Sequence, residues 1–179
     1  MKRLFATVLA LLGLSAPAMA TAPAEEPDAT TQGLRRMALT LTPDAIGLSR
    51  ATYPHEVWGI VMETGLEGGS YTLVSLADGT TSLYFSTGGG IIGAGAHAPV
   101  RQASQQFIGL ANDALAAARP TDAYPLPEAG ETVFYFLTFD GVRRYAAREA
   151  DLGEMRDRLS TLFHAGHGVI TAVRQTKAD

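Results

Sequence analysis

The apolar and polar positions first define strands in the middle of the chain. Residues 70–77 and 80–87 are rich in β-branched, aromatic and aliphatic side chains, and only Asp78-Gly79 separates them. Asp and Gly tolerate the positive φ angles of a two-residue type I′ turn, so this pattern predicts an antiparallel hairpin. Residues 57–64 have a similar composition. We therefore expect three consecutive strands of one sheet here.

The last third of the chain repeats the hairpin pattern. Residues 131–139 and 142–149 have strand composition and flank Asp140-Gly141. Residues 168–174 predict a final strand. The whole pattern thus predicts an antiparallel sheet of about six strands that contains two Asp-Gly hairpins.

A helical spacing of three and four residues follows each hairpin. Residues 99–118 and 151–163 each place apolar side chains along one stripe. The stripes consist of Val100, Ala103, Phe107, Leu110, Ala111, Ala114 and Leu115 in the first helix, and of Leu152, Met155, Leu159 and Leu162 in the second. Pro120 ends the first helix, and Gly166 is the expected C-terminal cap of the second.

The segment before the first strand has weaker signals. Residues 21–33 are rich in Ala, Pro, Thr and acidic residues and predict a disordered lead-in, after which residues 34–41 begin the ordered part. Thr42 and Pro43 predict the N-cap and first position of a short helix. Two main helices and this short one on an antiparallel sheet define an α+β fold, expected as a single domain over 34–179.

The first twenty residues have the three parts of a cleavable secretory signal peptide. Lys2 and Arg3 form a short positive region, residues 4–14 are almost continuously apolar, and Ala18-Met19-Ala20 is a small-x-small triplet. The apolar run is shorter than the ~20 residues that a membrane-spanning helix needs. No cysteine is present for lipid attachment. We therefore expect cleavage after Ala20, no membrane association afterwards, and a bacterial periplasmic or secreted protein.

Composition narrows the classes of function. Removal of Lys2 and Arg3 with the signal peptide leaves 12 basic and 18 acidic residues, a formal net charge of −6. This sign argues against nucleic acid as a partner, because phosphate binding depends on clustered Lys and Arg. The lack of cysteine excludes disulfides, thiol nucleophiles and zinc–thiolate sites.

The most unusual stretch is the glycine-rich run of residues 88–97 between a predicted strand and a predicted helix. Backbone N–H groups can converge on an anion at a helix N-terminus, so the glycines of the run are candidate ligand-binding residues. These are Gly88, Gly89, Gly90, Gly93 and Gly95. The alternative, which we favour, is structural: the glycines let the chain pass close to another element and turn into the helix, with Ile91 and Ile92 buried.

A dinucleotide site is the sharper interpretation of the same run, because Gly88, Gly90 and Gly93 satisfy G-x-G-x-x-G. Such a site needs a parallel βαβ unit and an acidic residue at the end of the next strand. Here the preceding strand belongs to a hairpin, and Asp113, at about the right distance, falls inside the predicted helix. We therefore expect no cofactor.

A resemblance also centres on this run. The segment S-L-Y-F-S-T-G-G-G-I-I-G-A-G over 82–95, followed by V-R-Q-A over 100–103, resembles the core of a set of uncharacterised bacterial proteins that carry S-L-Y-F-S-x-G-G-G-x-I-G-x-G. The likeness covers the central third of the chain and extends to Val169-Ile170-Thr171. It implies no activity. Where that loop has an acid before the histidine, this chain has Ala96, which counts against a catalytic role for His97.

Candidate catalytic residues are few. Ser86 precedes the glycine run and His97 ends it, and Asp78 could complete a Ser-His-Asp group, although a turn position explains Asp78 more simply. Neither G-x-S-x-G nor S-x-x-K occurs. The chain is therefore not assigned as an enzyme.

The candidate metal ligands are two histidines. His164 and His167 have a spacing found in metal pairs, with His55 and Glu56 as the nearest further ligands. The pair straddles the predicted end of a helix, and a histidine there also suits the helix dipole. We therefore expect no metal site.

Two hypotheses of function remain. The first is a non-catalytic exported domain that binds a partner protein or a small ligand in the cell envelope or medium. The second is a small extracytoplasmic enzyme or anion-binding protein with its site at residues 88–95 and His97 as base. The direction of the N–H groups in the glycine run separates an anion site from a structural role.

Overall fold

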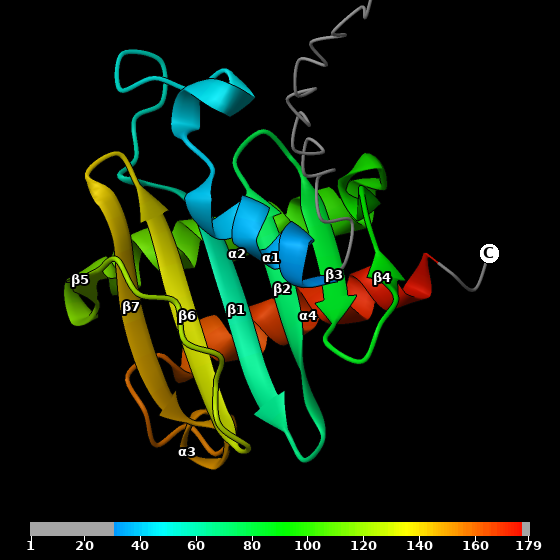
Figure 1. Ribbon diagram of the computed structural model, residues 1–179. Helices are drawn as coiled ribbons and strands as arrows, with labels where there is room; N and C mark the ends of the chain where they lie inside the picture. The colour runs from blue at the N-terminus through cyan, green and yellow to red at the C-terminus, as the bar shows by residue number, and fades with distance from the viewer. Residues whose placement is uncertain (1–30, 177–179) are drawn as a thin grey trace, which may run out of the picture.

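The computed structural model describes residues 31–176, which form one antiparallel sheet with helices on both faces (Figure 1). The sheet has seven strands in the order β4-β3-β2-β1-β6-β7-β5, all antiparallel. The strands are β1 (Val57–Leu66), β2 (Gly69–Leu76), β3 (Thr81–Phe85), β4 (Gly90–Ile91), β5 (Arg119–Thr121), β6 (Glu131–Thr138) and β7 (Gly141–Arg148). The predicted α+β class is confirmed.

Both predicted hairpins are present. β2 pairs with β3, ending at Ser75 opposite Thr81, and β6 pairs with β7, ending at Thr138 opposite Gly141. Only the glycines have positive φ angles, 94° at Gly79 and 108° at Gly141. The predicted type I′ geometry is therefore wrong, because it needs two consecutive residues with positive φ.

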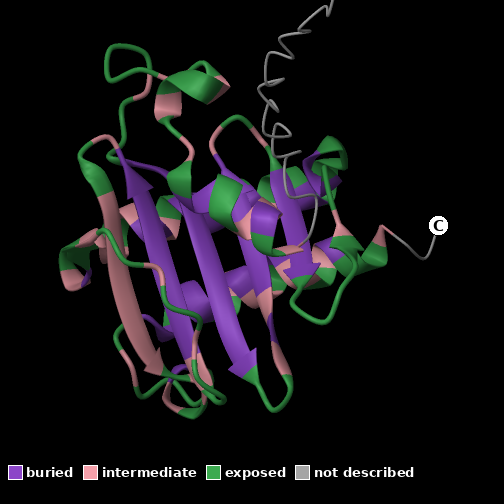
Figure 2. Ribbon diagram, in the orientation of Figure 1, coloured by how far each residue is buried: buried purple, intermediate pink, exposed green. Residues whose placement is uncertain are grey.

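Helices cover the sheet unequally. α2 (Ala98–Ala114) and α4 (Ser160–Gln175) lie behind the sheet in Figure 1, and α1 (Thr31–Thr40) lies in front of it. The side chains of α2 and α4 pack against one face of the sheet and form the larger apolar core. A smaller apolar core lies between α1 and the other face. Every residue of β1 except Leu66 is buried, as the purple centre of the sheet in Figure 2 shows. The central strand is thus enclosed on both faces.

The predicted strand over 168–174 is wrong, and so is the helix over 151–163. The chain forms α3 (Glu149–Gly153), a connection, and then α4, which runs through both segments. Gly166 lies inside α4, where a Cβ would be 2.7 Å from the sulfur of Met62. The glycine therefore brings α4 close to the sheet instead of ending a helix. Val169 and Val173 continue the buried stripe at helical spacing.

The N-terminal prediction also needs correction. α1 begins at Thr31, inside the predicted lead-in, whereas residues 1–30, with the predicted signal peptide, lie outside the described residues. The short helix begins where predicted, with Thr42 as its N-cap residue and Pro43 at its start, but it is a 3-10 turn (Pro43–Ile46) and the side chain of Thr42 makes no capping hydrogen bond. Within residues 31–176, no helix has the length and apolar character needed to cross a membrane.

Candidate functional site

The glycine-rich run forms the turn and the outer strand of a hairpin at one edge of the sheet. After β3 the chain reverses and returns as β4, with Leu83 opposite Ile91 and Tyr84 opposite Gly90. The reversal is closed by a hydrogen bond of 3.1 Å from the N–H of Phe85 to the carbonyl oxygen of Gly89. Gly88 and Gly89 have φ angles of 105° and 81°, which side chains rarely permit. The run is therefore an edge strand and its turn.

Close packing explains two further glycines. A Cβ on Gly90 would lie 2.5 Å from the carbonyl oxygen of Leu83, and a Cβ on Gly95 would overlap the carbonyl oxygen of Gly79. The chain thus passes against β3 and against the β2–β3 turn before it enters α2. The predicted burial of Ile92 is wrong, because its side chain is 67 % exposed. Ile91 is half-buried and packs against the larger core.

Several N–H groups of the run already bind oxygen atoms of the chain. Gly88 donates to Phe85 (2.9 Å), Ala96 to Gly93 (3.3 Å) and His97 to Ala94 (3.1 Å), all through backbone carbonyls. Gly93 donates over 3.4 Å to the hydroxyl of Ser82. An anion site needs several N–H groups that converge on one point. These four point at four different acceptors.

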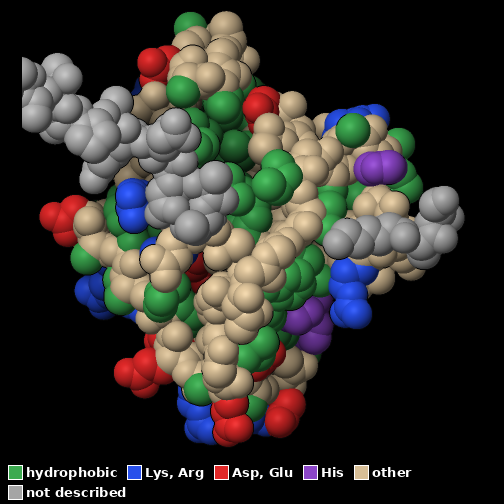
Figure 3. All heavy atoms as spheres, turned by 45° about the vertical axis from the view of Figure 1, so that its right-hand side comes forward, with side chains coloured by type: hydrophobic (Ala, Val, Ile, Leu, Met, Phe, Trp, Pro, Cys, Tyr) green, Lys and Arg blue, Asp and Glu red, His purple; other side chains and the backbone are tan. Residues whose placement is uncertain are grey.

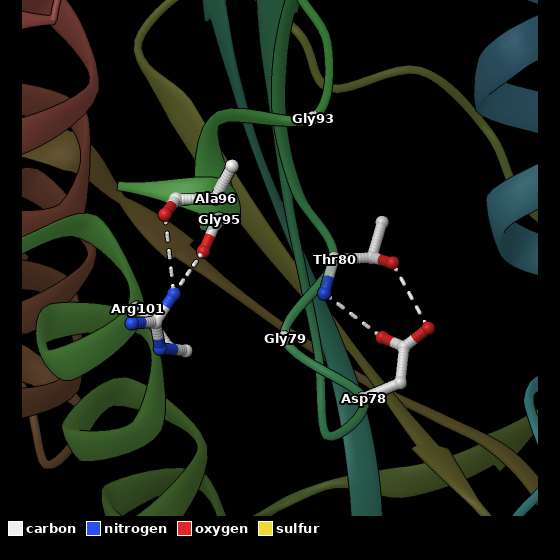
Figure 4. A pocket seen from close by; sticks show the side chains of 7 residues that line it. All are labelled: Asp78, Gly79, Thr80, Gly93, Gly95, Ala96 and Arg101. Carbon is white, nitrogen blue, oxygen red and sulfur yellow. Dashed lines mark hydrogen bonds between the residues drawn. The ribbon is translucent and has the colours of Figure 1, made fainter. Parts of the chain in front are cut away.

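An open hollow of about 330 Å³ lies between the β2–β3 turn and the start of α2 (Figure 4). Arg101 reaches into it and donates from Nη1 to the carbonyl oxygens of Gly95 (2.9 Å) and Ala96 (3.3 Å). On the other wall, the Asp78 carboxylate turns toward Thr80 and accepts from its N–H and its hydroxyl, each over 2.9 Å. Both charged groups thus hold loops in place.

Ser86 and His97 lie at opposite ends of β3. The hydroxyl of Ser86, just after β3, accepts a hydrogen bond of 2.7 Å from the N–H of Ser70. His97 is the exposed N-cap residue of α2, near the β2–β3 turn that precedes β3. A strand of this length separates the two by roughly 15 Å. They cannot act on one bond in this arrangement.

The two candidate metal ligands on α4 face different surroundings. Nε2 of His167 lies 3.2 Å from the hydroxyl of Tyr71, and its ring packs against Phe163 at 4.4 Å between centroids. His164 is exposed, with Nε2 3.2 Å from the carbonyl oxygen of Gly153. Among the described residues, no group of three or more His, Cys, Asp and Glu side chains could hold a metal ion. Sequence analysis did not identify the Tyr71–His167 pair.

The His167 ring should make the stability of the protein depend on pH. Its burial, and then the nearby His164, lower the pKa of His167 from the ordinary value of 6.5. Burial also raises the pKa of Tyr71 to about 12, so this hydroxyl stays protonated. Below pH 6.5, His167 therefore binds a proton more readily in the unfolded chain than in the folded chain. The stabilisation is fully present above pH 6.5, and it decreases as the pH falls below this value.

Chemical denaturation between pH 5 and 8 measures this dependence, since that range spans the ordinary titration of histidine. The free energy of unfolding should lose part of its pH dependence in His167→Gln and keep it in the matched variant His164→Gln. Equal pH dependence in His167→Gln and the unmodified protein would rule out His167 as the cause.

A buried ion pair joins α1 to the sheet, and sequence analysis missed it. Arg35 donates from Nε and Nη2 to the two carboxylate oxygens of Glu63, both over 2.7 Å. Glu63 is fully buried in β1 and also accepts from the hydroxyl of Thr72 over 2.7 Å. Arg35 reaches the carbonyl oxygen of Tyr124 as well, over 3.0 Å. This cluster fastens α1 and the segment before β6 onto one face.

Burial opposes the charge of Arg35, but the hydrogen bonds and the charge of Glu63 outweigh burial, so the pKa of Arg35 is raised. The Arg35 guanidinium is therefore charged, and it binds both carboxylate oxygens of Glu63. A charged residue inside an otherwise apolar strand was the available signal in the sequence, at Glu63.

No protein-family model matches the chain, and no curated protein or solved structure is significantly similar to it.

Proposed function

We propose that this chain is an exported, non-catalytic binding protein, and that the edge formed by β3 and β4 takes up a polypeptide partner. The observation that carries the proposal is a difference between the two edges of one sheet. Natural proteins protect exposed strand edges with charged side chains and proline, because an open edge pairs with other chains. Among the described residues, only one of the two outer strands carries a charged side chain and a proline.

The protected edge is β5, with the sequence Arg119-Pro120-Thr121. Pro120 has no N–H to donate and Arg119 carries a charge and is exposed. β5 pairs with β7 on its inner side. A further strand would therefore meet a proline and a charged side chain at this edge.

The edge at β4 has neither feature in the part of the chain that the structure describes. Residues 81–96 contain no charged residue and no proline. Two apolar side chains are exposed along them, Ile92 at 67 % and Phe85 at 38 %. Figure 3 brings this side of the molecule forward and shows a tan and green tract of backbone, uncharged polar and hydrophobic atoms, with the charged side chains mostly at its margins. In the part of the chain that the structure describes, β4 has no partner strand on its outer side.

These features suit recognition by strand addition, in which main-chain hydrogen bonds supply the affinity. Glycine at 88–90 favours it further, because a backbone without Cβ atoms lets another backbone approach closely. A non-catalytic role is supported by the separation of Ser86 and His97. Export to the periplasm or medium is supported by the signal-peptide pattern of residues 1–20.

Site-specific photo-cross-linking in the producing cell tests this proposal. A photoreactive amino acid at Ile92 should form covalent adducts with a polypeptide. The same amino acid at Met155, which is 62 % exposed in the α3–α4 connection, is the matched control and should not. Adducts that are absent at Ile92, or equally abundant at both positions, would contradict a binding role for this edge.

A further inference from the structure

We infer that the acidic segment of residues 21–30 binds to its own domain, in a hollow between α1 and the segment that precedes β6. The hollow has a volume of about 350 Å³, and six residues line it: Gln32, Arg35, Arg36, Leu39, Tyr124 and Leu126. None of the six belongs to residues 81–96, so this surface is distinct from the strand edge and the inference goes beyond the proposed function.

Hydrogen bonds hold the walls of the hollow in place. Nη2 of Arg35 on α1 donates to the carbonyl oxygens of Tyr124 (3.0 Å) and Pro125 (3.3 Å). The hydroxyl of Tyr135 on β6 donates to the same Pro125 oxygen over 2.8 Å. The domain itself therefore fixes both walls, and an occupant does not have to order them when it binds.

The lining of the hollow is basic. Two of the six residues are arginines, and none is acidic. Arg35 directs Nε and Nη2 to the carboxylate of Glu63, so Arg36, which is exposed, supplies the positive charge at the surface. The next acidic residue along the wall that precedes β6 is Glu128, whose backbone packs against Gly65 near the end of β1. The hollow therefore favours an acidic occupant.

Residues 21–30 have the complementary charge. They contain three acidic residues, Glu25, Glu26 and Asp28, and no basic residue. α1 has no acidic residue in its own first turn, so acids that return along this helix would also lie near the positive end of its dipole. The same segment thus meets two positive features of the domain.

The segment is long enough to reach the hollow. Arg36 lies five residues after Thr31, the first residue of α1, which is about 8 Å along the helix axis. Asp28 is three residues before Thr31 and Glu26 is five, so the intervening chain spans up to about 10 Å and 17 Å. Both carboxylates therefore come within reach of Arg36 when the segment turns back along α1.

Apolar surface in the hollow suits the same segment. Leu126 is 54 % exposed. Ala24, Pro27 and Ala29 flank the acidic residues of the segment. Covering Leu126 with these small apolar side chains removes apolar surface from water, and it costs almost no side-chain entropy because Ala and Pro have none to lose.

Paramagnetic broadening of amide signals tests the inference. The chain has no cysteine, so Ala24→Cys provides a single attachment point for a nitroxide label. In the purified chain the label should broaden the signals of residues 124–126. Arg36→Glu should reduce this broadening about two- to fivefold, the effect of one exposed ion pair. Adding Glu25→Arg and Glu26→Arg to Arg36→Glu should restore it.

A matched variant separates a local contact from the effect of net charge. Arg158 is exposed in the α3–α4 connection, and Arg158→Glu makes the same change in charge away from the hollow. This variant should leave the broadening at residues 124–126 unchanged. Circular dichroism confirms that each variant is folded.

Equal broadening in Arg36→Glu and the labelled parent chain would overturn the inference, and so would an exchange variant that restores nothing. An equal decrease in Arg158→Glu would overturn it as well, because net charge alone would then explain the result. The cross-links at Ile92 test the proposed function separately, so either conclusion can fail without the other.

Discussion

Replacing Arg35 by methionine should lower the free energy of unfolding by about 3–5 kcal/mol. The guanidinium neutralises Glu63, which is fully buried and binds both Nε and Nη2 of Arg35 over 2.7 Å. Methionine fills similar space but leaves the carboxylate without its counter-charge. Urea denaturation of the variant and the unmodified protein measures the difference.

The neighbouring residue provides the control for this prediction. Arg36 lies on the same helix and is exposed, so Arg36→Met should change the free energy of unfolding by less than about 1 kcal/mol. Combining Arg35→Met with Glu63→Leu should recover much of the loss, because apolar replacement of a buried pair is often neutral. A loss below 1 kcal/mol for Arg35→Met alone would show that the pair does not hold α1 on the sheet.

Replacing Gly95 by alanine should destabilise the protein by about 3 kcal/mol or prevent folding. The added Cβ would overlap the carbonyl oxygen of Gly79, and a backbone atom cannot move aside as a side chain can. Both the β2–β3 turn and the start of α2 would have to shift, and Arg101 would lose its contacts with Gly95 and Ala96. Thermal unfolding followed by circular dichroism measures the effect.

Gly109 serves as the control, because its replacement by alanine is expected to stabilise the protein. Gly109 is exposed inside α2, and nothing lies within 4 Å of a Cβ built there. Gly109→Ala should therefore stabilise the protein by about 0.5–1 kcal/mol through helix propensity alone. The packing account of the glycine run would be contradicted if Gly95→Ala were as stable as the unmodified protein.

The local sequence pattern predicted an element correctly where the residues of that element alone determine its structure. Strand composition on both sides of Asp78-Gly79 and Asp140-Gly141 predicted the two hairpins, and the apolar stripe of 99–118 predicted α2. The prediction for segment 168–174 failed because its β-branched residues also fit a helical stripe, and the packing of that stripe in the larger core, which the sequence does not show, favours the helix. α1 was missed because its place on the sheet depends on Glu63, 28 residues from Arg35.

The amino-acid composition pointed to the glycine run of residues 88–97 as a candidate site, but it did not predict how the run folds. The glycine run was recognised as unusual, yet β4 spans only Gly90–Ile91, too short for any alternation to show. Its identity as an edge depends on pairing with β3, and the exposure of Ile92 follows from that pairing. Tyr71 and His167 lie 96 residues apart and meet only because α4 packs behind β2.

The central claim is that the edge at β4 takes up a polypeptide partner, and amide hydrogen exchange of the free chain and of the adduct cross-linked at Ile92 tests it most directly. The account predicts that exchange at residues 89–93 is slower in the adduct, while exchange at the other edge, residues 119–121, is unchanged. Exchange at 89–93 that is equally fast in both would contradict the claim.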